Sequence, residues 1–375
     1  MKCRAAVLHK MGAPEPYTNS RPIKIEEIEL DPPGEGEVLI KVAAAGLCHS
    51  DLSVVNGSRP RPLPMVIGHE ASGIVEAVGP GRCLFERGDH VVAVFVPSCG
   101  TCIPCSEGRP ALCEPAAISN ANGTLLEGRK RIKLKGEYIS HHVGVSCFSE
   151  YAVVSQHSLV KIDKAIPLDL AALFGCAVIT GVGAVVNTAQ LNMGDTATVV
   201  GLGGTGLAAV LGAKASGAKS VIGVDLNETK LKLGLEVGCD AVFNGKDPEL
   251  INKVRDYTGG GADFAFECVG SKQAMEIAYS LTRRGGTTCT SGLSDPAEKF
   301  AIQHVNLVAE EKTIKGSYLG SCIPKRDIPS YIELERNGRL PVSQLMSEKI
   351  SLDEINSGFD ALSQGNTVRQ LIIFG

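Results

Sequence analysis

Four cysteines lie close together near residue 100, and their spacing is suited to a metal ion. Within 15 residues the chain places Cys99, Cys102, Cys105 and Cys113. Four thiolates fill a tetrahedral site and leave no position for a substrate, which is typical of structural zinc. An iron–sulfur cluster is the alternative, although the C-x3-C-P continuation of bacterial ferredoxins is missing. The pattern predicts a structural zinc lobe.

A second chemical pattern is a glycine-rich loop between an apolar run and a run of small residues. Its glycines are Gly201, Gly203, Gly204 and Gly206. The preceding run, Thr196–Gly201, has the length of a strand, and the following run, Gly204–Gly217, is typical of a helix. Glycines without Cβ let the backbone approach a pyrophosphate whose charge lies at the helix N-terminus. This context predicts a dinucleotide-binding loop. A purely structural turn of an unrelated doubly wound domain is the alternative.

Asp225 indicates which dinucleotide the loop would bind. It stands 19 positions after Gly206, at the end of the next predicted strand. A carboxylate there accepts hydrogen bonds from the adenosine ribose hydroxyls and repels a 2′-phosphate. The next residues, Leu226 and Asn227, supply no arginine for such a phosphate. We therefore expect NAD rather than NADP.

Three further segments carry residues that could bind a metal or move a proton. They are Cys48-His49-Ser50-Asp51, Gly68-His69-Glu70, and Cys176 within an apolar run. Taken alone, each has a structural explanation, since a buried cysteine behaves as a small hydrophobe. Their spacing does not connect positions so far apart in the chain.

The elements that must position these residues differ between two parts of the chain. The first 160 residues contain short valine-rich runs that are typical of strands. These runs are Val38–Ala43, Gly73–Val78, His90–Val96 and Tyr151–Val154. From about Ala171, strand-like and helical runs alternate, as in a parallel sheet covered by helices. They are Thr196–Gly201, Gly204–Gly217, Ser220–Asp225, Glu228–Val237, Phe264–Val269 and Thr287–Gly292. Two helices, Asp327–Asn337 and Leu352–Gln364, and a strand, Arg369–Phe374, are expected near the end.

Composition excludes several classes of protein. The 375 residues are 44% hydrophobic and 21% charged, which is typical of a soluble globular protein with two or three domains. The net charge of −4 provides no basic field for nucleic acid. The most apolar stretches, Ala171–Val186 and Thr198–Ala213, are 16 residues long, whereas a spanning helix needs about 20. With no export signal near Met1, we expect a cytoplasmic protein without membrane segments.

Together, these residues resemble the zinc-dependent medium-chain alcohol dehydrogenases. The matching motifs run in family order over essentially the whole chain. They are Gly46–Asp51, Gly68–Gly73, the four-cysteine lobe, Gly175-Cys176, the glycine loop with Asp225, and Gly358-Phe359. The resemblance implies an α/β fold in which a Rossmann doubly wound parallel sheet is inserted into a β-rich GroES-like catalytic domain. It predicts a catalytic domain at 1–177 with its lobe at 99–113, a Rossmann domain at 178–320 and a C-terminal return at 321–375.

The resemblance also implies a second zinc, the catalytic one. Cys48, His69 and Cys176 would bind it and leave one position open. Asp51 would hydrogen-bond His69 and fix its tautomer, and Glu70 would lie behind the metal. The implied cofactors are therefore two zinc ions per chain and NAD.

The remaining implied roles concern the proton and the cofactor. Ser50 would bridge the alcohol to the nicotinamide ribose. His49 occupies a position where some members carry an arginine that contacts the pyrophosphate. Lys230 would lie near the adenosine ribose, and Arg369 would bind the pyrophosphate. An ordinary surface charge is the alternative for the last two. The pair His141-His142 would lie near the wall of the substrate pocket, with no role as ligands.

The implied activity is the NAD-linked oxidation of primary aliphatic or aromatic alcohols to aldehydes, and the reverse, by hydride transfer from a zinc-bound alkoxide. A thiol-dependent formaldehyde dehydrogenase and a polyol dehydrogenase are the alternatives. Glutathione-dependent members carry an arginine just after the last cysteine of the lobe, whereas Glu114–Ile118 contains no base here. A zinc-scaffolded redox sensor and a zinc-ribbon protein that binds nucleic acid are alternatives of other classes. We expect a homodimer, with a homotetramer as the alternative, and a small-molecule alcohol or aldehyde as the only other partner.

Overall fold

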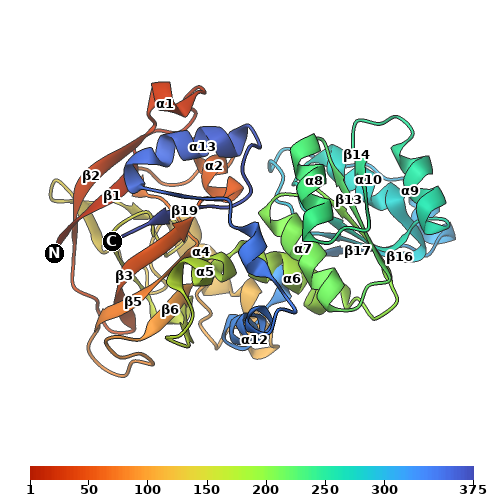
Figure 1. Cartoon of the computed structure of the whole chain (residues 1–375). Coiled ribbons are helices and arrows are strands. Elements are labelled where there is room, and N and C mark those ends of the chain that lie inside the picture. Colours follow the sequence, from red (N-terminus) through yellow and green to blue (C-terminus); the bar gives the residue numbers. More distant parts are fainter. The chain divides into compact units, whose positions relative to one another are not determined.

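The computed structural model describes all 375 residues, and the chain divides into two units (Figure 1). The first unit comprises Met1–Cys176, Ile323–Ile332 and Met346–Gly375. The second comprises Ala177–Cys322 and Glu333–Leu345. The chain therefore leaves the first unit after Cys176 and later returns to it, so that the second unit is an insertion.

The first unit is built on two sheets. One has the strand order β8-β7-β2-β1-β4-β9, and the other has the order β11-β6-β5-β3-β19-β18, with β10 also paired to β3. The strands are β1 (Lys2–Leu8), β2 (Ile23–Leu30), β3 (Glu37–Gly46), β4 (Met65–Val66), β5 (Ala71–Val78), β6 (His90–Ala93), β7 (Ile132–Leu134), β8 (Glu137–Tyr138), β9 (Ser140–His141), β10 (Tyr151–Ser155), β11 (Leu159–Ile162), β18 (Glu348–Ile350) and β19 (Gln370–Ile373).

Strand β3 has no solvent face over most of its length. Because successive side chains point to opposite faces of a strand, Val38 and Ile40 enter one apolar core and Leu39 enters another. β3 pairs with β5, β10 and β19. Its end at Gly46 is therefore held firmly where the candidate ligand residues begin.

The helices of the first unit are short. They are α1 (Tyr17–Ser20), α2 (His49–Val55), α3 (Ile103–Ser106), α4 (Glu114–Asn122), α5 (Leu168–Ala172) and α13 (Ile355–Ser363), with 3₁₀ turns η1 (Pro110–Leu112), η2 (Gln156–Ser158), η3 (Leu173–Gly175) and η7 (Leu352–Glu354). The predicted helix Leu352–Gln364 is thus a 3₁₀ turn followed by α13. Another helix, α12 (Pro324–Arg336), runs from the first unit into the second and begins three residues earlier than predicted, with a proline at its first position.

The second unit contains a parallel sheet of six strands in the order β14-β13-β12-β15-β16-β17. They are β12 (Thr196–Val200), β13 (Ser220–Asp225), β14 (Ala241–Asn244), β15 (Ala262–Glu267), β16 (Thr282–Thr290) and β17 (Thr313–Gly316). Numbered along the chain, this is the order 3-2-1-4-5-6 of the Rossmann fold. The predicted strand Thr287–Gly292 begins earlier, at Thr282, because the polar and glycine-rich segment before it also belongs to β16.

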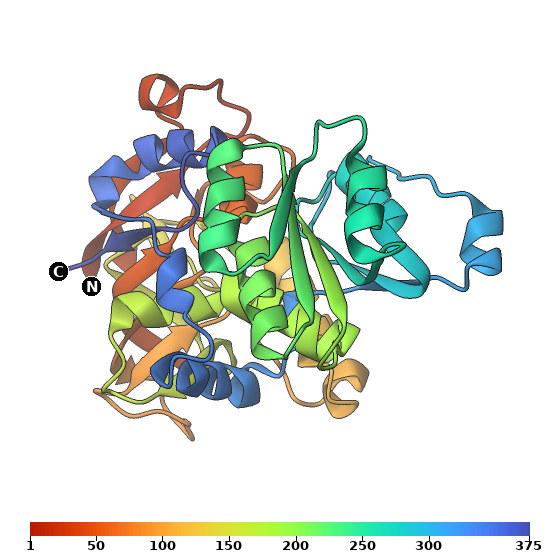
Figure 2. The ribbon, with the colours of Figure 1, turned by 45° about the vertical axis from the view of Figure 1, so that its right-hand side comes forward.

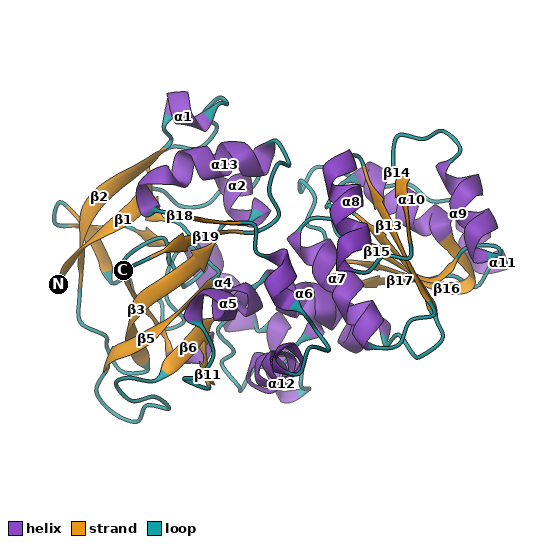
Figure 3. Ribbon diagram, viewed as in Figure 1, coloured by secondary structure: helices purple, strands orange, loops and turns teal.

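Helices cover both faces of this sheet. Figures 2 and 3 show α7 (Gly204–Ala215) and α8 (Glu228–Val237) on one face, with α9 (Leu250–Thr258) and α10 (Lys272–Leu281) on the other. The remaining helical segments are α6 (Ala177–Gly183), η4 (Ala184–Ala189), α11 (His304–Ala309), η5 (Leu319–Ser321) and η6 (Val342–Leu345). The central strands β12 and β13 are largely apolar and buried, as expected for a parallel sheet between two helical layers.

No single helix is long and apolar enough to cross a membrane. Two consecutive segments, Leu168–Gly175 and Ala177–Ala189, reach that length only when they are added together across a bend.

His141 in β9 is a base buried inside the first unit. Its Nε2 atom accepts the N–H of Arg131 at 3.0 Å, and its Nδ1 atom has no partner. Burial lowers the pKa of His141 from 6.5 to about 3, and Lys130 and Arg131 act in the same direction. The ring is therefore neutral in the folded protein at any pH above that value.

We expect this histidine to make folding acid-sensitive. Because the unfolded chain binds a proton at His141 below about pH 6.5 and the folded chain does not, the free energy of unfolding falls as the pH decreases from 6.5 towards 3. The loss between pH 7 and pH 5 is about 2 kcal/mol. His141→Gln keeps an acceptor for Arg131 and should lose this part of the pH dependence. Urea unfolding of both proteins at the two pH values tests this, and equal losses would contradict it.

Candidate metal centre and active site

The first candidate ligand lies where β3 passes into α2. Cys48 is the N-cap residue of α2, in an extended conformation with φ −132° and ψ 151°. Its N–H donates to Asp51 Oδ2 at 3.1 Å. A carboxylate in the first turn of a helix satisfies backbone N–H groups that have no partner within the helix. The local fold therefore fixes Cys48 and Asp51 together.

The same carboxylate orients the second candidate ligand. His69 Nδ1–H donates to Asp51 Oδ1 at 2.7 Å, and both side chains are buried. This hydrogen bond leaves Nε2 as the free lone pair of the ring, and Nε2 lies 3.3 Å from the sulfur of Cys176. The edge of the Phe95 ring packs against the imidazole, with centroids 5.4 Å apart. His69 is thus held in the tautomer that a metal ion requires.

Cys48, His69 and Cys176 form one buried group, although they come from three distant parts of the chain. Their ligand atoms all lie within 4.8 Å of one another. A hydrogen bond from Cys176 lowers the pKa of Cys48 well below its ordinary value, and the nearby charge of Arg369 helps to outweigh the opposing effect of burial. The thiolate is the form of cysteine that binds metals. Two sulfurs and one imidazole fit a zinc ion with one coordination position left for substrate.

Behind these ligands lies a buried ion pair. Arg369 Nη2 is 3.2 Å from Glu70 Oε2, and Nη1 donates to the carbonyl of Leu47 at 2.9 Å. Both side chains are at most 3% exposed. No local pattern indicated that Arg369 and Glu70 meet, because β3 brings them together by pairing with both β19 and β5. A surface charge, the alternative for Arg369, is wrong, because the residue is buried.

His142 also lies beside the candidate ligands. Its Nδ1 atom accepts the N–H of Gly68 at 3.1 Å and is 3.2 Å from Asp51 Oδ1. Its ring meets that of His69 edge-on, with centroids 5.6 Å apart. Burial lowers the pKa of His142, which favours the neutral ring that accepts from Gly68. Asp51, His69 and His142 thus make a second close group of ligand atoms, which the sequence pattern did not suggest.

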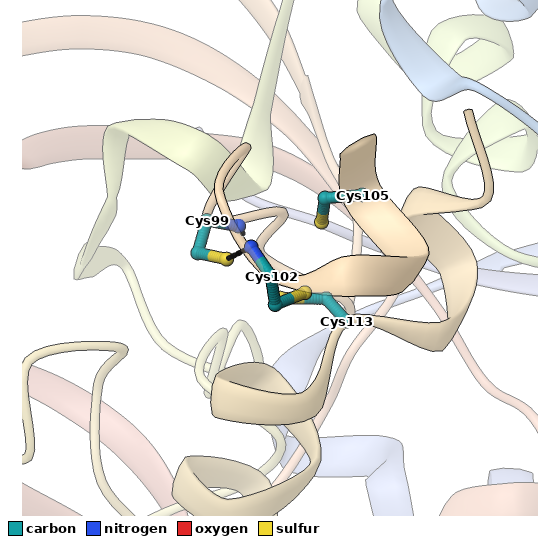
Figure 4. Close-up of side chains that lie close together, drawn as sticks. All are labelled: Cys99, Cys102, Cys105 and Cys113. Carbon is teal, nitrogen blue, oxygen red and sulfur yellow. Dashed lines mark hydrogen bonds between the residues drawn. The ribbon is translucent and has the colours of Figure 1, made fainter. Parts of the chain in front are cut away.

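The four-cysteine lobe is also assembled as predicted from its spacing. Figure 4 shows Cys99, Cys102, Cys105 and Cys113 gathered around α3, and their sulfurs lie within 4.8 Å of one another. The N–H groups of Cys102 and Thr101 donate to Cys99 Sγ at 3.3 and 3.4 Å. Burial raises the pKa of Cys99, but these donors outweigh it and lower the pKa to about 6. No disulfide competes, because all thirteen cysteines are free thiols.

The glycine loop has the shape of a dinucleotide-binding turn. Gly201 has φ +92°, and a Cβ there would collide with the side chain of Val269. Gly203 is the N-cap residue of α7, and a Cβ there would meet no atom within 4 Å. Asp225 Oδ2 accepts the N–H of Leu202 at 2.7 Å. Asp225, which was expected to bind the adenosine ribose, therefore also holds the glycine loop through this hydrogen bond.

The remaining predicted residues lie at helix surfaces. His49 is exposed and Ser50 is half-buried, both in the first turn of α2. Lys230 is half-buried in the first turn of α8. His49 and Ser50 are the first two residues of α2 and directly follow its N-cap residue, Cys48.

Comparison with known proteins decides the family. The family model of the alcohol dehydrogenase GroES-like domain matches residues 34–164, and that of the zinc-binding dehydrogenases matches residues 204–336. A putative alcohol dehydrogenase D of Mycobacterium tuberculosis is 40% identical over 377 residues, which covers 100% of both chains. The chain belongs to the zinc-binding alcohol dehydrogenases. An NDMA-dependent alcohol dehydrogenase of Amycolatopsis methanolica is also 40% identical over 379 residues, covering 100% of this chain and 99% of the other.

A solved structure extends the similarity to the whole fold. The benzyl alcohol dehydrogenase of Acinetobacter calcoaceticus superimposes with a TM-score of 0.93 at 32% identity, with 100% of both chains covered. The family and the fold class expected from the sequence are therefore confirmed, and the chain is an alcohol dehydrogenase. The roles of the individual site residues stay predictions.

In this alcohol dehydrogenase we expect the Glu70–Arg369 pair to matter for stability. Glu70→Gln would leave a buried guanidinium without its carboxylate, which should reduce the free energy of unfolding by about 3 kcal/mol. Glu27→Gln, which breaks the exposed ion pair with Lys2, is the matched control and should change little. Denaturant unfolding measures both. Equal losses of unfolding free energy in the two variants would show that the buried pair contributes no more to stability than the exposed one.

Proposed function

We propose that this dehydrogenase oxidises primary aliphatic or aromatic alcohols to aldehydes with NAD, and catalyses the reverse reduction. The observation that carries the proposal is the buried group of Cys48, His69 and Cys176, with Asp51 behind His69. A zinc ion held by these three residues would act as a Lewis acid on the alcohol oxygen and lower its pKa. The similarity to a protein named as a benzyl alcohol dehydrogenase supports an aromatic or similarly apolar substrate.

The protein's own groups would then position the substrate and move its proton. Ser50 follows Cys48 by two residues, and its hydroxyl would accept the alcohol proton at Oγ. His49, exposed in the same turn, would pass that proton to solvent or contact the pyrophosphate. Asp51 would keep His69 Nε2 available, and Glu70 would lie behind the metal as the partner of Arg369.

The cofactor that we propose is NAD. Gly201, Gly203, Gly204 and Gly206 would hold the pyrophosphate at the start of α7, while Asp225 would bind the adenosine ribose and disfavour a 2′-phosphate. Lys230 and Arg369 would add positive charge to the adenosine and pyrophosphate parts of the site. The four-cysteine lobe would hold a second, structural zinc ion, which gives two per chain.

Turnover with simple alcohols tests this function. We expect the purified enzyme to form NADH from benzyl alcohol and hexanol, to do so poorly with NADP, and to lose activity after chelation. Formaldehyde with glutathione and a polyol such as sorbitol test the alternative substrates. A set of reactions with NDMA is included because one relative is named as dependent on it. Activity with the thiol adduct or polyol alone would contradict the proposed substrate class.

Cys48→Ser tests the ligand assignment. Losing one thiolate of the open site should reduce turnover by at least about 10²-fold and bound zinc from two per chain to one, while NADH binding survives. Cys3→Ser is the matched control, since Cys3 is buried in the same unit and lies outside both metal groups. Turnover, metal content by mass spectrometry and NADH fluorescence are measured for all three proteins. Full activity in Cys48→Ser would overturn the assignment.

We also propose that the enzyme is a homodimer, formed through Val305–Ser317, which contains the edge strand β17. Thr287–Gly292, also expected at the interface, does not lie at the edge of the sheet, because β16 pairs with β15 on one side and with β17 on the other. Val305 and Val308 in α11 are 67% and 66% exposed, which is unusual for valine and supports an interface there. Light scattering should give twice the chain mass of 39.3 kDa. A monomer or a tetramer would contradict this expectation.

A further inference from the structure

Glu267 carries a buried carboxylate at the carboxyl end of a central strand of the parallel sheet. It is the last residue of β15, and it is 1% exposed. Its neighbours across the sheet are Val200 at the end of β12 and Thr290 at the end of β16. Ligands of Rossmann folds bind at this end of the strands. Neither the sequence pattern nor the proposed chemistry uses Glu267.

The carboxylate of Glu267 holds two loops at once. Oε1 accepts the N–H groups of Val269 and Gly270 at 2.8 and 2.6 Å. Oε2 accepts the hydroxyl of Thr290 at 2.6 Å. The main-chain oxygen of Glu267 also accepts the N–H of Ser291 at 2.9 Å. A single residue therefore ties the loop after β15 to the loop after β16.

The two loops touch through their backbones, which makes the arrangement rigid. Gly270 has φ +82°, and a Cβ there would lie 2.7 Å from the backbone of Leu293. A Cβ at Gly292 would lie 2.6 Å from Glu267 Oε2 and would collide with the N–H of Gly270. Neither glycine leaves room for a side chain between the loops. The positions of both loops are therefore set by the carboxylate beneath them.

These loops present two apolar side chains to solvent. Val269 is 53% exposed and Leu293 is 50% exposed. Val269 also lies against Gly201, the first glycine of the dinucleotide loop. Exposed apolar groups held on a rigid backbone beside a polar ligand site are suited to a flat, weakly polar part of that ligand. In a dinucleotide with its pyrophosphate at α7, that part is the nicotinamide ring.

We propose that Glu267 is a positioning residue for the nicotinamide end of the dinucleotide, acting through Val269 and Leu293. The glycine loop would hold the pyrophosphate and Asp225 the adenosine ribose, so that the two ends of the dinucleotide would depend on different residues. This inference rests on the proposed use of NAD. Glu267 would not contact the dinucleotide itself, yet it would affect the binding of the nicotinamide half selectively.

Removing the acceptors of Glu267 tests the proposal. Glu267→Leu leaves the N–H groups of Val269 and Gly270 without partners, whereas Glu267→Gln keeps one oxygen for both and is the conservative control. We expect Glu267→Leu to bind ADP-ribose within about twofold of the wild type and NADH at least about tenfold more weakly. Glu267→Gln should bind both ligands nearly as the wild type does. Calorimetry and NADH fluorescence on the full-length enzyme give the dissociation constants.

The ratio of the two affinities separates positioning from a general loss of structure. Equal weakening of NADH and ADP-ribose, or no weakening of either, would overturn the inference. If Glu267→Leu does not fold, Thr290→Val, which removes only the donor to Oε2, should still weaken NADH selectively, and an unchanged ratio in this variant would overturn the inference. A wild-type enzyme that binds neither ligand would overturn the proposed function and this inference with it.

Discussion

The candidate metal centre depends on one buried carboxylate, that of Asp51. One of its oxygens accepts from the N–H of Cys48 and the other from the ring of His69, so that one side chain fixes two of the three candidate ligands. A buried charge is costly unless hydrogen bonds compensate it. Asp51 is compensated only when α2 begins at Cys48 and the chain before β5 presents His69. The same carboxylate therefore determines where α2 begins and how two of the candidate ligands are placed.

Each unit carries the candidate residues for one part of the proposed chemistry. The mostly antiparallel sheets of the first unit bring Cys48, His69 and Cys176 together. The parallel sheet of the second unit supports the glycine loop and Asp225 at its carboxyl edge. In both, a buried carboxylate fixes the residues that would meet the ligand: Asp51 in the first unit and Glu267 in the second.

Some local elements were predicted well from the sequence, whereas others, such as α9 and α10, and the long-range contacts were not. The strand Ser220–Asp225 and the helix Glu228–Val237 agree with the prediction residue by residue, because their signals lie within a few turns of chain. Strand β2 was missed, since its glutamates interrupt the alternation of apolar residues. No spacing rule links Cys48, His69 and Cys176, so that only the family resemblance suggested the group. The contacts of Arg369 with Glu70 and of Glu267 with two loops arise from strand pairing, which no local pattern encodes.

The insertion of the second unit has a consequence for how the protein is made. Strand β19 pairs with β3 at Ala44, Ala45 and Gly46, directly before Cys48, and it follows Arg369, the partner of Glu70. On the ribosome, the sheet that carries the candidate ligands stays incomplete until β19 has emerged. The inserted unit, whose strands are nearly continuous in sequence, can fold earlier. The candidate metal centre would therefore be completed after the inserted unit, when β19 pairs with β3.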